Sequence, residues 1–333
     1  MTQARFKLAL AAVAVSATFS AVPALAGALV KVDGSSTVYP ITEAVAEEFQ
    51  KAKKGAVKVT VGVSGTGGGF KKFCRGETDI SDASRPILTK EMAACKDAGI
   101  KYFELPIAYD ALTVVVNPKN DWATTMTVAQ LKKMWEPAAK GEVTYWSDVV
   151  PGWPATNIKL FGPGADSGTF DYFTEAINGK AKASRPDFTA SEDDNVLVTG
   201  VSRDKYALAY FGYAYYVENQ KKLKAVAIVN KEGKAVLPSK QAVEDGSYNP
   251  LARPIFIYVN AASYNKPEVK EFVEFYLTHG GQMASEVKYI ALPKVAYDMD
   301  KEHLAKGKLG TVFGGDEAVG LKVEDLLKRE AKE

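Results

Sequence analysis

Histidine and cysteine are both scarce in this chain of 333 residues, which contains two of each. The histidines, His279 and His303, lie late in the chain, far apart and in polar surroundings. Zinc sites and many hydrolytic active sites need such residues in close clusters. We therefore expect no metal ion, no organic cofactor and no catalytic residue, which argues against an enzyme.

Long apolar runs are also lacking, apart from one at the start of the chain. A short basic segment with Arg5 and Lys7 precedes this run, which ends in an Ala-x-Ala pattern at Ala26. This order predicts a secretory signal peptide over residues 1–26. The run is too short and too rich in alanine for a membrane anchor. No cysteine precedes Cys74, so the cleavage site has no acceptor for a lipid anchor, and we expect a secreted chain without membrane insertion.

An excess of charge of one sign is absent. The chain has 42 basic and 40 acidic residues, and loss of the predicted signal peptide removes two basic residues and no acid. Proteins that bind nucleic acids or anionic membranes through charge carry a basic excess. We therefore expect neither as a partner.

The two cysteines, Cys74 and Cys95, both lie in the part of the chain that would be exported. An even number of cysteines in an oxidising compartment favours a disulfide over two buried free thiols. We predict that these two residues are joined.

Short apolar, β-branched runs alternate with segments whose apolar residues recur at helical spacing. Val38, Ile41, Val45 and Phe49 illustrate the helical spacing. This alternation predicts an α/β fold with mostly parallel strand pairing. The predicted strands are residues 28–32, 57–63, 112–116, 158–161, 225–229 and 255–259.

The length of the chain favours two domains over one. Residues 105–110 and 252–254 have the composition of crossings between domains. Two crossings would insert one domain into the other. The prediction is a first lobe of residues 27–107 and 255–333, and a second lobe of residues 108–254.

Three segments share one composition, because each joins a predicted strand to a predicted helix and is rich in Ser, Thr and Gly. They are residues 32–40, 63–70 and 161–170. The first turn of a helix has backbone N–H groups without intrahelical acceptors, and the helix dipole adds positive charge there. Such a turn binds anions, and hydroxyls add further donors. N-capping explains any one of these turns, but three of them favour a shared site for a small anion.

A fourth segment places Ser84 and Arg85 after a short predicted strand. Arg85 is a candidate for bidentate contact with an oxyanion, or for a surface ion pair with Asp82. Known catalytic motifs do not fit the glycine-rich turns. Residues 65–69 lack the Gly-Lys-Ser/Thr of a P-loop, and Ser167 does not lie in a Gly-x-Ser-x-Gly motif.

Taken together, these segments resemble the periplasmic phosphate-binding proteins of Pst-type ABC importers, in the type II periplasmic-binding-protein superfamily. The resemblance extends over nearly the whole mature chain. It implies two Rossmann-like α/β lobes, joined by two hinge crossings, that close over one dehydrated phosphate ion. The segments that carry it are residues 33–40, 64–70, 79–87, 166–170 and 190–195.

The resemblance implies phosphate contacts in all four hydroxyl-rich segments, with Ser64 and Thr66 as alternatives in the glycine-rich turn. The implied contacts are Ser36, Thr37, Val38, Ser64, Thr66, Gly67, Ser84, Arg85, Ser167, Gly168 and Thr169.

Two positions depart from the family pattern. Many members have an aspartate at the position of Ser84, which accepts the phosphate proton and so rejects sulfate. Many also have an arginine a few residues before the Ser-Gly-Thr turn, where this chain has Gly162, Pro163 and Gly164. Arg85 is the candidate replacement for that arginine. The candidate replacements for the acceptor are Asp82, Asp166 and Asp194.

The function that the resemblance implies is a monomeric periplasmic receptor. It would capture inorganic phosphate by lobe closure and deliver it to the membrane permease of an ABC importer. A receptor for another tetrahedral oxyanion, such as sulfate, arsenate or molybdate, is the nearest alternative, and an acceptor carboxylate in the site would disfavour anions without a proton. A secreted phosphatase or a phosphate-scavenging adhesin is a further alternative, but a phosphatase needs a metal or an activated nucleophile.

Overall fold

The structure is a computed structural model that describes residues 28–165, 167–191 and 193–314. The predicted signal peptide lies outside these ranges. Within them, no helix has the length and apolar character needed to cross a membrane.

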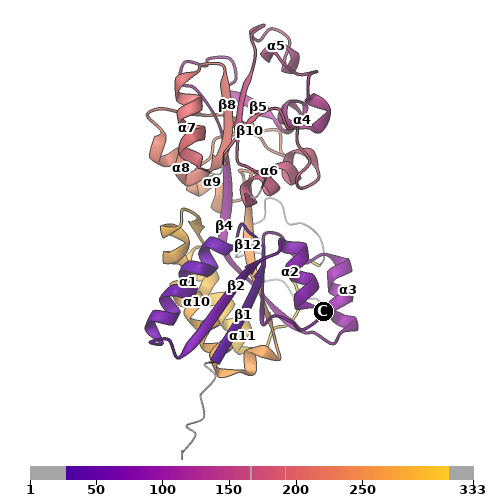
Figure 1. The fold of residues 1–333 in the computed structure, drawn as a ribbon, viewed down its shortest axis with the longest axis vertical. Coiled ribbons are helices and arrows are strands. Elements are labelled where there is room, and N and C mark those ends of the chain that lie inside the picture. The colour runs from indigo at the N-terminus through magenta and orange to yellow at the C-terminus, as the bar shows by residue number, and fades with distance from the viewer. Residues whose placement is uncertain (1–27, 166, 192, 315–333) are drawn as a thin grey trace, which may run out of the picture.

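Two lobes joined by two long strands make up the described chain (Figure 1). The strands are β4 (Tyr102–Val116) and β12 (Ala252–Asn260), which are antiparallel neighbours. β12 pairs with β3 in one lobe, whereas the last part of β4 pairs with β8 in the other. The sheet therefore continues from one lobe into the other.

The first lobe, at the bottom of Figure 1, contains the sheet order β2-β1-β3-β12-β4, with β13 also paired to β4. β1 is parallel to β2 and to β3, so these three strands end at the same edge of the sheet. Besides β4 and β12, the elements of this lobe are β1 (Ala28–Gly34), α1 (Tyr39–Ala52), β2 (Val57–Val63), α2 (Thr66–Phe73), β3 (Ile80–Ala83), α3 (Thr89–Asp97), a 3₁₀ turn (Ser263–Asn265), α10 (Pro267–Glu286), β13 (Ile290–Ala291) and α11 (Lys294–Ala305).

The second lobe extends the sheet in the order β4-β8-β6-β7, where β6 is parallel to β7 and β8. A separate small sheet has the order β11-β10-β5. The elements of this lobe are β5 (Thr125–Thr127), α4 (Val128–Trp135), a 3₁₀ turn (Pro137–Ala139), α5 (Trp146–Val149), β6 (Lys159–Gly162), α6 (Gly168–Asn178), β7 (Thr189–Ala190), α7 (Asp194–Arg203), β8 (Ala207–Gly212), α8 (Tyr213–Asn219), β9 (Lys224–Ala225), β10 (Ala227–Val229), β11 (Ala235–Val236) and α9 (Lys240–Glu244).

The helical spacing of apolar residues explains how α1 is placed. Ile41, Val45 and Phe49 are fully buried on one face of α1, and Phe49 packs edge-on against Phe272 of α10. Burial of each such side chain is worth about 1.5–3 kcal/mol relative to exposure. This packing holds the first turn of α1 at the edge of the sheet where β1 ends.

The α/β class is confirmed, but the expectation of mostly parallel pairing is wrong for the two crossing strands. β4 runs from the first lobe to the second and β12 returns, so these neighbours must be antiparallel. The predicted strand at residues 57–63 is confirmed as β2, whereas the one at 112–116 is only the end of β4. The lobe boundaries at 107/108 and 254/255 fall inside β4 and within β12, and they stay a prediction.

Candidate anion-binding site

The ends of the three parallel strands β1, β2 and β3 bring three of the four predicted segments together. The backbone N–H of Ser64 donates to the carbonyl oxygen of Gly34 at 3.1 Å. On the other side of β1, the N–H of Ser35 donates to the carbonyl oxygen of Asp82 at 3.0 Å. The carboxyl ends of parallel strands are where α/β sheets bind ligands.

The first turn of α1 follows β1 directly. Ser35 organises the turn between them, because its Oγ accepts from the N–H of Thr37 at 3.2 Å and its carbonyl oxygen accepts from Tyr39 at 3.0 Å. Ser36, Thr37 and Val38 form this turn, and Val38 is the N-terminal cap of α1, so the three residues lie at the positive end of the helix dipole. The prediction placed anion contacts at these three residues but overlooked Ser35.

The glycine-rich turn before α2 separates the two hydroxyls that the sequence left as alternatives. Thr66 Oγ1 lies 2.9 Å from Ser84 Oγ and accepts from the N–H of Ser84 at 3.1 Å. Ser64 instead donates its hydroxyl to Asp33 Oδ1, and Lys72 Nζ lies 2.7 Å from Asp33 Oδ2. Thr66 and Ser84 thus form the hydroxyl pair at this edge, whereas the Ser64 hydroxyl is engaged by a carboxylate.

The α2 helix also approaches the sheet very closely. A Cβ atom on Gly69 would lie 2.6 Å from the Cα atom of Gly34, so only glycine fits there without a shift. This contact holds the first turn of α2, with Gly67, beside the end of β1.

The remaining segment, residues 161–170, comes from the other lobe. Ser167 caps α6, because its Oγ accepts from the N–H of Thr169 at 3.2 Å. Gly168 lies against Thr37, since a Cβ atom on Gly168 would be 2.7 Å from the Thr37 nitrogen. The turn before α1 and the first turn of α6 therefore meet across the boundary between the lobes.

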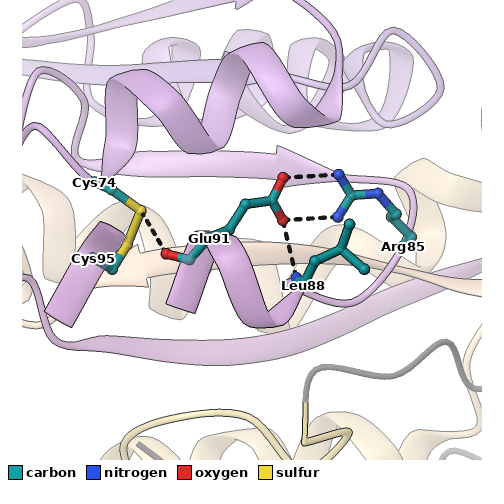
Figure 2. Close-up of a disulfide and its surroundings, with 5 residues drawn as sticks. All are labelled: Cys74, Arg85, Leu88, Glu91 and Cys95. Atoms are coloured by element: carbon teal, nitrogen blue, oxygen red, sulfur yellow. Dashed lines mark hydrogen bonds and ion pairs between the residues drawn. A yellow bond between two sulfur atoms is a disulfide. The ribbon is translucent and has the colours of Figure 1, made fainter. Parts of the chain in front are cut away.

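Arg85 has a different partner from the one expected. It forms a bidentate ion pair with Glu91, with both N–O distances at 2.9 Å, rather than a pair with Asp82 (Figure 2). The side chains of Arg85 and Glu91 are only 13% and 9% exposed. Glu91 also accepts from the N–H of Leu88 at 3.0 Å. This network holds the loop after β3 and engages both Nη atoms of Arg85, whose role as an anion contact stays a prediction.

A disulfide lies near the C-terminal end of α3, the helix that contains Glu91. Cys74 and Cys95 are joined, as the sequence predicted, and Cys74 Sγ lies 3.5 Å from the carbonyl oxygen of Glu91 (Figure 2). The bond fastens α3, and with it Glu91, to the end of α2.

The three candidate acceptors of the phosphate proton lie in different surroundings. The Asp82 carboxylate accepts from Thr42 Oγ1 at 3.0 Å and is fully buried beneath α1. Burial raises its pKa well above the usual range, and the charge of Asp33 adds to this effect. Asp166 lies outside the described residues. Asp194 begins α7 and is half-buried. The role of these residues as acceptors stays a prediction.

Sequence reasoning missed a charged group on the two crossing strands. Arg253 of β12 lies opposite Asp110 of β4, and its Nε is 4.0 Å from Asp110 Oδ2. Burial raises the pKa of Asp110 to about 6, and the positive charge of Arg253 limits the rise. The sequence predicted only that these segments cross between the domains. It did not predict the ion pair, because Asp110 and Arg253 lie far apart in the chain.

Tyr289 connects this charged group to the turn before α1. Its OH donates to the carbonyl oxygen of Thr37 at 2.7 Å. Burial raises its pKa, and the carboxylates of Asp110 and Asp194 raise it further. A neutral phenol at this position is a hydrogen-bond donor that stays protonated at physiological pH.

Comparisons with known proteins identify the family of this chain. A family model described as a PBP superfamily domain matches residues 21–279. Protein SphX of Synechocystis is 54% identical over 303 residues, which cover 91% of this chain and 90% of SphX. The phosphate-binding protein PstS of Staphylococcus saprophyticus is 41% identical over 290 residues, 86% of each chain. The crystal structure of a possible phosphate-binding protein from Planctomyces limnophilus superposes with a TM-score of 0.80 at 53% identity, covering 84% of this chain and 98% of that one.

The fold and the facing helix N-termini define a two-lobed binding protein of the PBP superfamily. The chain belongs to the family of the PstS phosphate-binding proteins within that superfamily.

Proposed function

We propose that this chain is the secreted phosphate receptor of an ABC importer, captures inorganic phosphate between its two lobes and delivers it to a membrane permease. The observation that carries the proposal is the contact between Thr37 and Gly168, which brings the N-terminal ends of α1 and α6 together. Two helix N-termini and the Thr66–Ser84 hydroxyl pair offer a tetrahedral oxyanion a set of donors, which its removal from water requires.

Hinge motion about β4 and β12 would open and close the site, because these two strands connect the lobes. No covalent chemistry is needed for this task, and we propose a binding protein rather than an enzyme. We also propose that the protein acts as a monomer in the periplasm and needs no metal or cofactor. The names of the PstS relatives support a binding role over a phosphatase.

The test is a calorimetric titration of the purified, phosphate-stripped mature chain with phosphate, alone and with sulfate in large excess. We expect one-to-one phosphate binding that sulfate does not weaken. Strong competition by sulfate would widen the ligand class to oxyanions in general, because the site would then select its ligand by charge and shape alone and not by the phosphate proton. An absence of heat with both anions would overturn the receptor assignment.

A further inference from the structure

A buried pair of opposite charges lies on the crossing strands, with unused hydrogen-bonding capacity. The side chains of Arg253 and Asp110 are 12% and 7% exposed. Arg253 Nε and Asp110 Oδ2 are buried and form an ion pair at 4.0 Å, but neither atom forms a hydrogen bond with any of the described residues. Buried polar atoms without partners are rare, and each carries a desolvation penalty. A buried donor and a buried acceptor without hydrogen-bond partners indicate that a third group binds to them.

The rest of the Arg253 guanidinium lies along α6. Its carbon atom is 3.5 Å from the ring centre of Tyr172, and Nη1 donates to Glu175 Oε2 at 3.3 Å. Residues three and four positions apart share one face of a helix. Gly168, Tyr172 and Glu175 therefore lie on one face of α6, and Arg253 lies along the face that reaches Thr37 at its N-terminal end.

A second line of contacts leads from Arg253 to Thr37. Asp110 follows Tyr109, which pairs with Ile290 in the ladder between β4 and β13. The residue before Ile290 is Tyr289, whose OH bonds to the Thr37 carbonyl oxygen. The charges of Asp110 and Arg253 both act on the pKa of Tyr289, which is consistent with their closeness. Two lines of contacts thus connect Arg253 to Thr37, one along α6 and one through Tyr289.

Charge-assisted hydrogen bonds from a cation bind an oxyanion more strongly than neutral N–H donors do. Arg85 is held by both oxygens of Glu91, and residues 162–164 contain no cation. We propose that Arg253 is the cationic residue that binds the phosphate ion, and that Asp110 opposite it orients the guanidinium. This inference rests on the proposed function, since it names the charge partner of the same ligand.

Two substitutions with opposite expected effects test the proposal. Arg253→Gln removes the cation, and we expect phosphate affinity to fall about 10- to 100-fold by calorimetry. Glu175→Gln removes a negative charge beside the guanidinium, and we expect affinity to stay unchanged or to rise. A purely structural Arg253 would only tie α6 to β12, so both substitutions would break the same contact and weaken binding alike. That outcome would overturn the proposal.

Controls separate this inference from the proposed function. Arg203→Gln, at the exposed end of α7, removes the same charge elsewhere and should leave affinity unchanged. Wild-type protein that gives no heat with phosphate would refute the receptor function itself. Wild-type binding together with unchanged binding by Arg253→Gln would refute only the inference. Should Arg253→Gln fail to fold, Glu175→Gln decides alone, because weaker binding overturns the proposal and equal or tighter binding supports it.

Discussion

Gly168 lies so close to Thr37 that a Cβ atom on Gly168 would be 2.7 Å from the Thr37 backbone nitrogen. Gly168 begins α6 in the second lobe, whereas Thr37 precedes α1 in the first. The contact therefore depends on how closely the lobes approach each other, and a larger residue at either position would hold them apart.

Gly168→Ala should weaken phosphate binding by about 5- to 100-fold, because overpacking of this kind costs about 1–3 kcal/mol. Stability of the ligand-free protein should change little, since the lobes can separate. Calorimetry gives the affinity, and small-angle scattering with phosphate gives the lobe separation. Gly212→Ala is the matched control, because its added Cβ would meet nothing closer than a Tyr215 ring atom at 4.0 Å. Equal affinities for Gly168→Ala and the wild type would contradict the prediction.

The two hydroxyls of the glycine-rich turn should have separable effects. Thr66→Ala removes a donor beside Ser84, so we expect phosphate affinity to fall about tenfold or more, with little change in folding. Ser64→Ala removes a donor to the buried Asp33 carboxylate, and we expect a loss of about 1–3 kcal/mol in the free energy of unfolding. Paired titration and urea unfolding of both variants measure this. The reverse assignment of effects would show that Ser64 contacts the ligand.

Removal of the disulfide should lower stability rather than affinity. Replacement of Cys74 and Cys95 by alanine opens a loop with a sequence separation of 21, for which chain entropy predicts a loss of about 3 kcal/mol. Urea unfolding of the variant measures this loss, and the reduced wild type should match the variant. Phosphate affinity should change less than threefold, because the disulfide lies on the far side of Glu91 from Arg85, the residue that follows Ser84 in the chain (Figure 2). A variant as stable as the oxidised wild type would contradict the prediction.

Stability should depend on pH through Glu104. Burial raises the pKa of Glu104 from 4.5 to about 7, although Tyr258 OH and the N–H of Val312 donate to its carboxylate. The folded state therefore binds a proton more tightly than the unfolded state between these two values. This contribution to stability is complete below pH 4.5 and is lost as pH rises through about 7.

Glu104→Gln should remove that dependence. Relative to the wild type, the free energy of unfolding of the variant should rise by up to about 3 kcal/mol between pH 4.5 and pH 7.5. Urea unfolding across this range measures the difference, and Glu47→Gln on the exposed side of α1 is the control. A difference between variant and wild type that does not change with pH would contradict the assignment.

Local sequence patterns predicted much of this protein. The spacing of Ile41, Val45 and Phe49 indicated α1, and the Ser-Thr-Gly composition marked the turns before α1, α2 and α6. Long strands were predicted too short. Residues 105–110 were interpreted as a crossing between domains, whereas β4 continues through them.

The sequence did not predict which side chains pair with each other. Arg85 has Asp82 three residues away, yet it pairs with Glu91. Arg253 was seen only as part of a crossing, although strand register places it opposite Asp110. Sequence reasoning also kept Ser64 and Thr66 equal, because nothing local distinguishes one hydroxyl from the other.

The sequence alone determined the helical faces, the hydroxyl-rich turns and the pair of cysteines, since capping, turn formation and helical period depend on residues a few positions apart. Only the tertiary structure decided that Thr37 meets Gly168, that Thr66 meets Ser84 and that Arg253 meets Asp110. Those contacts follow from the register of strands and the approach of two lobes, which join residues far apart in the chain.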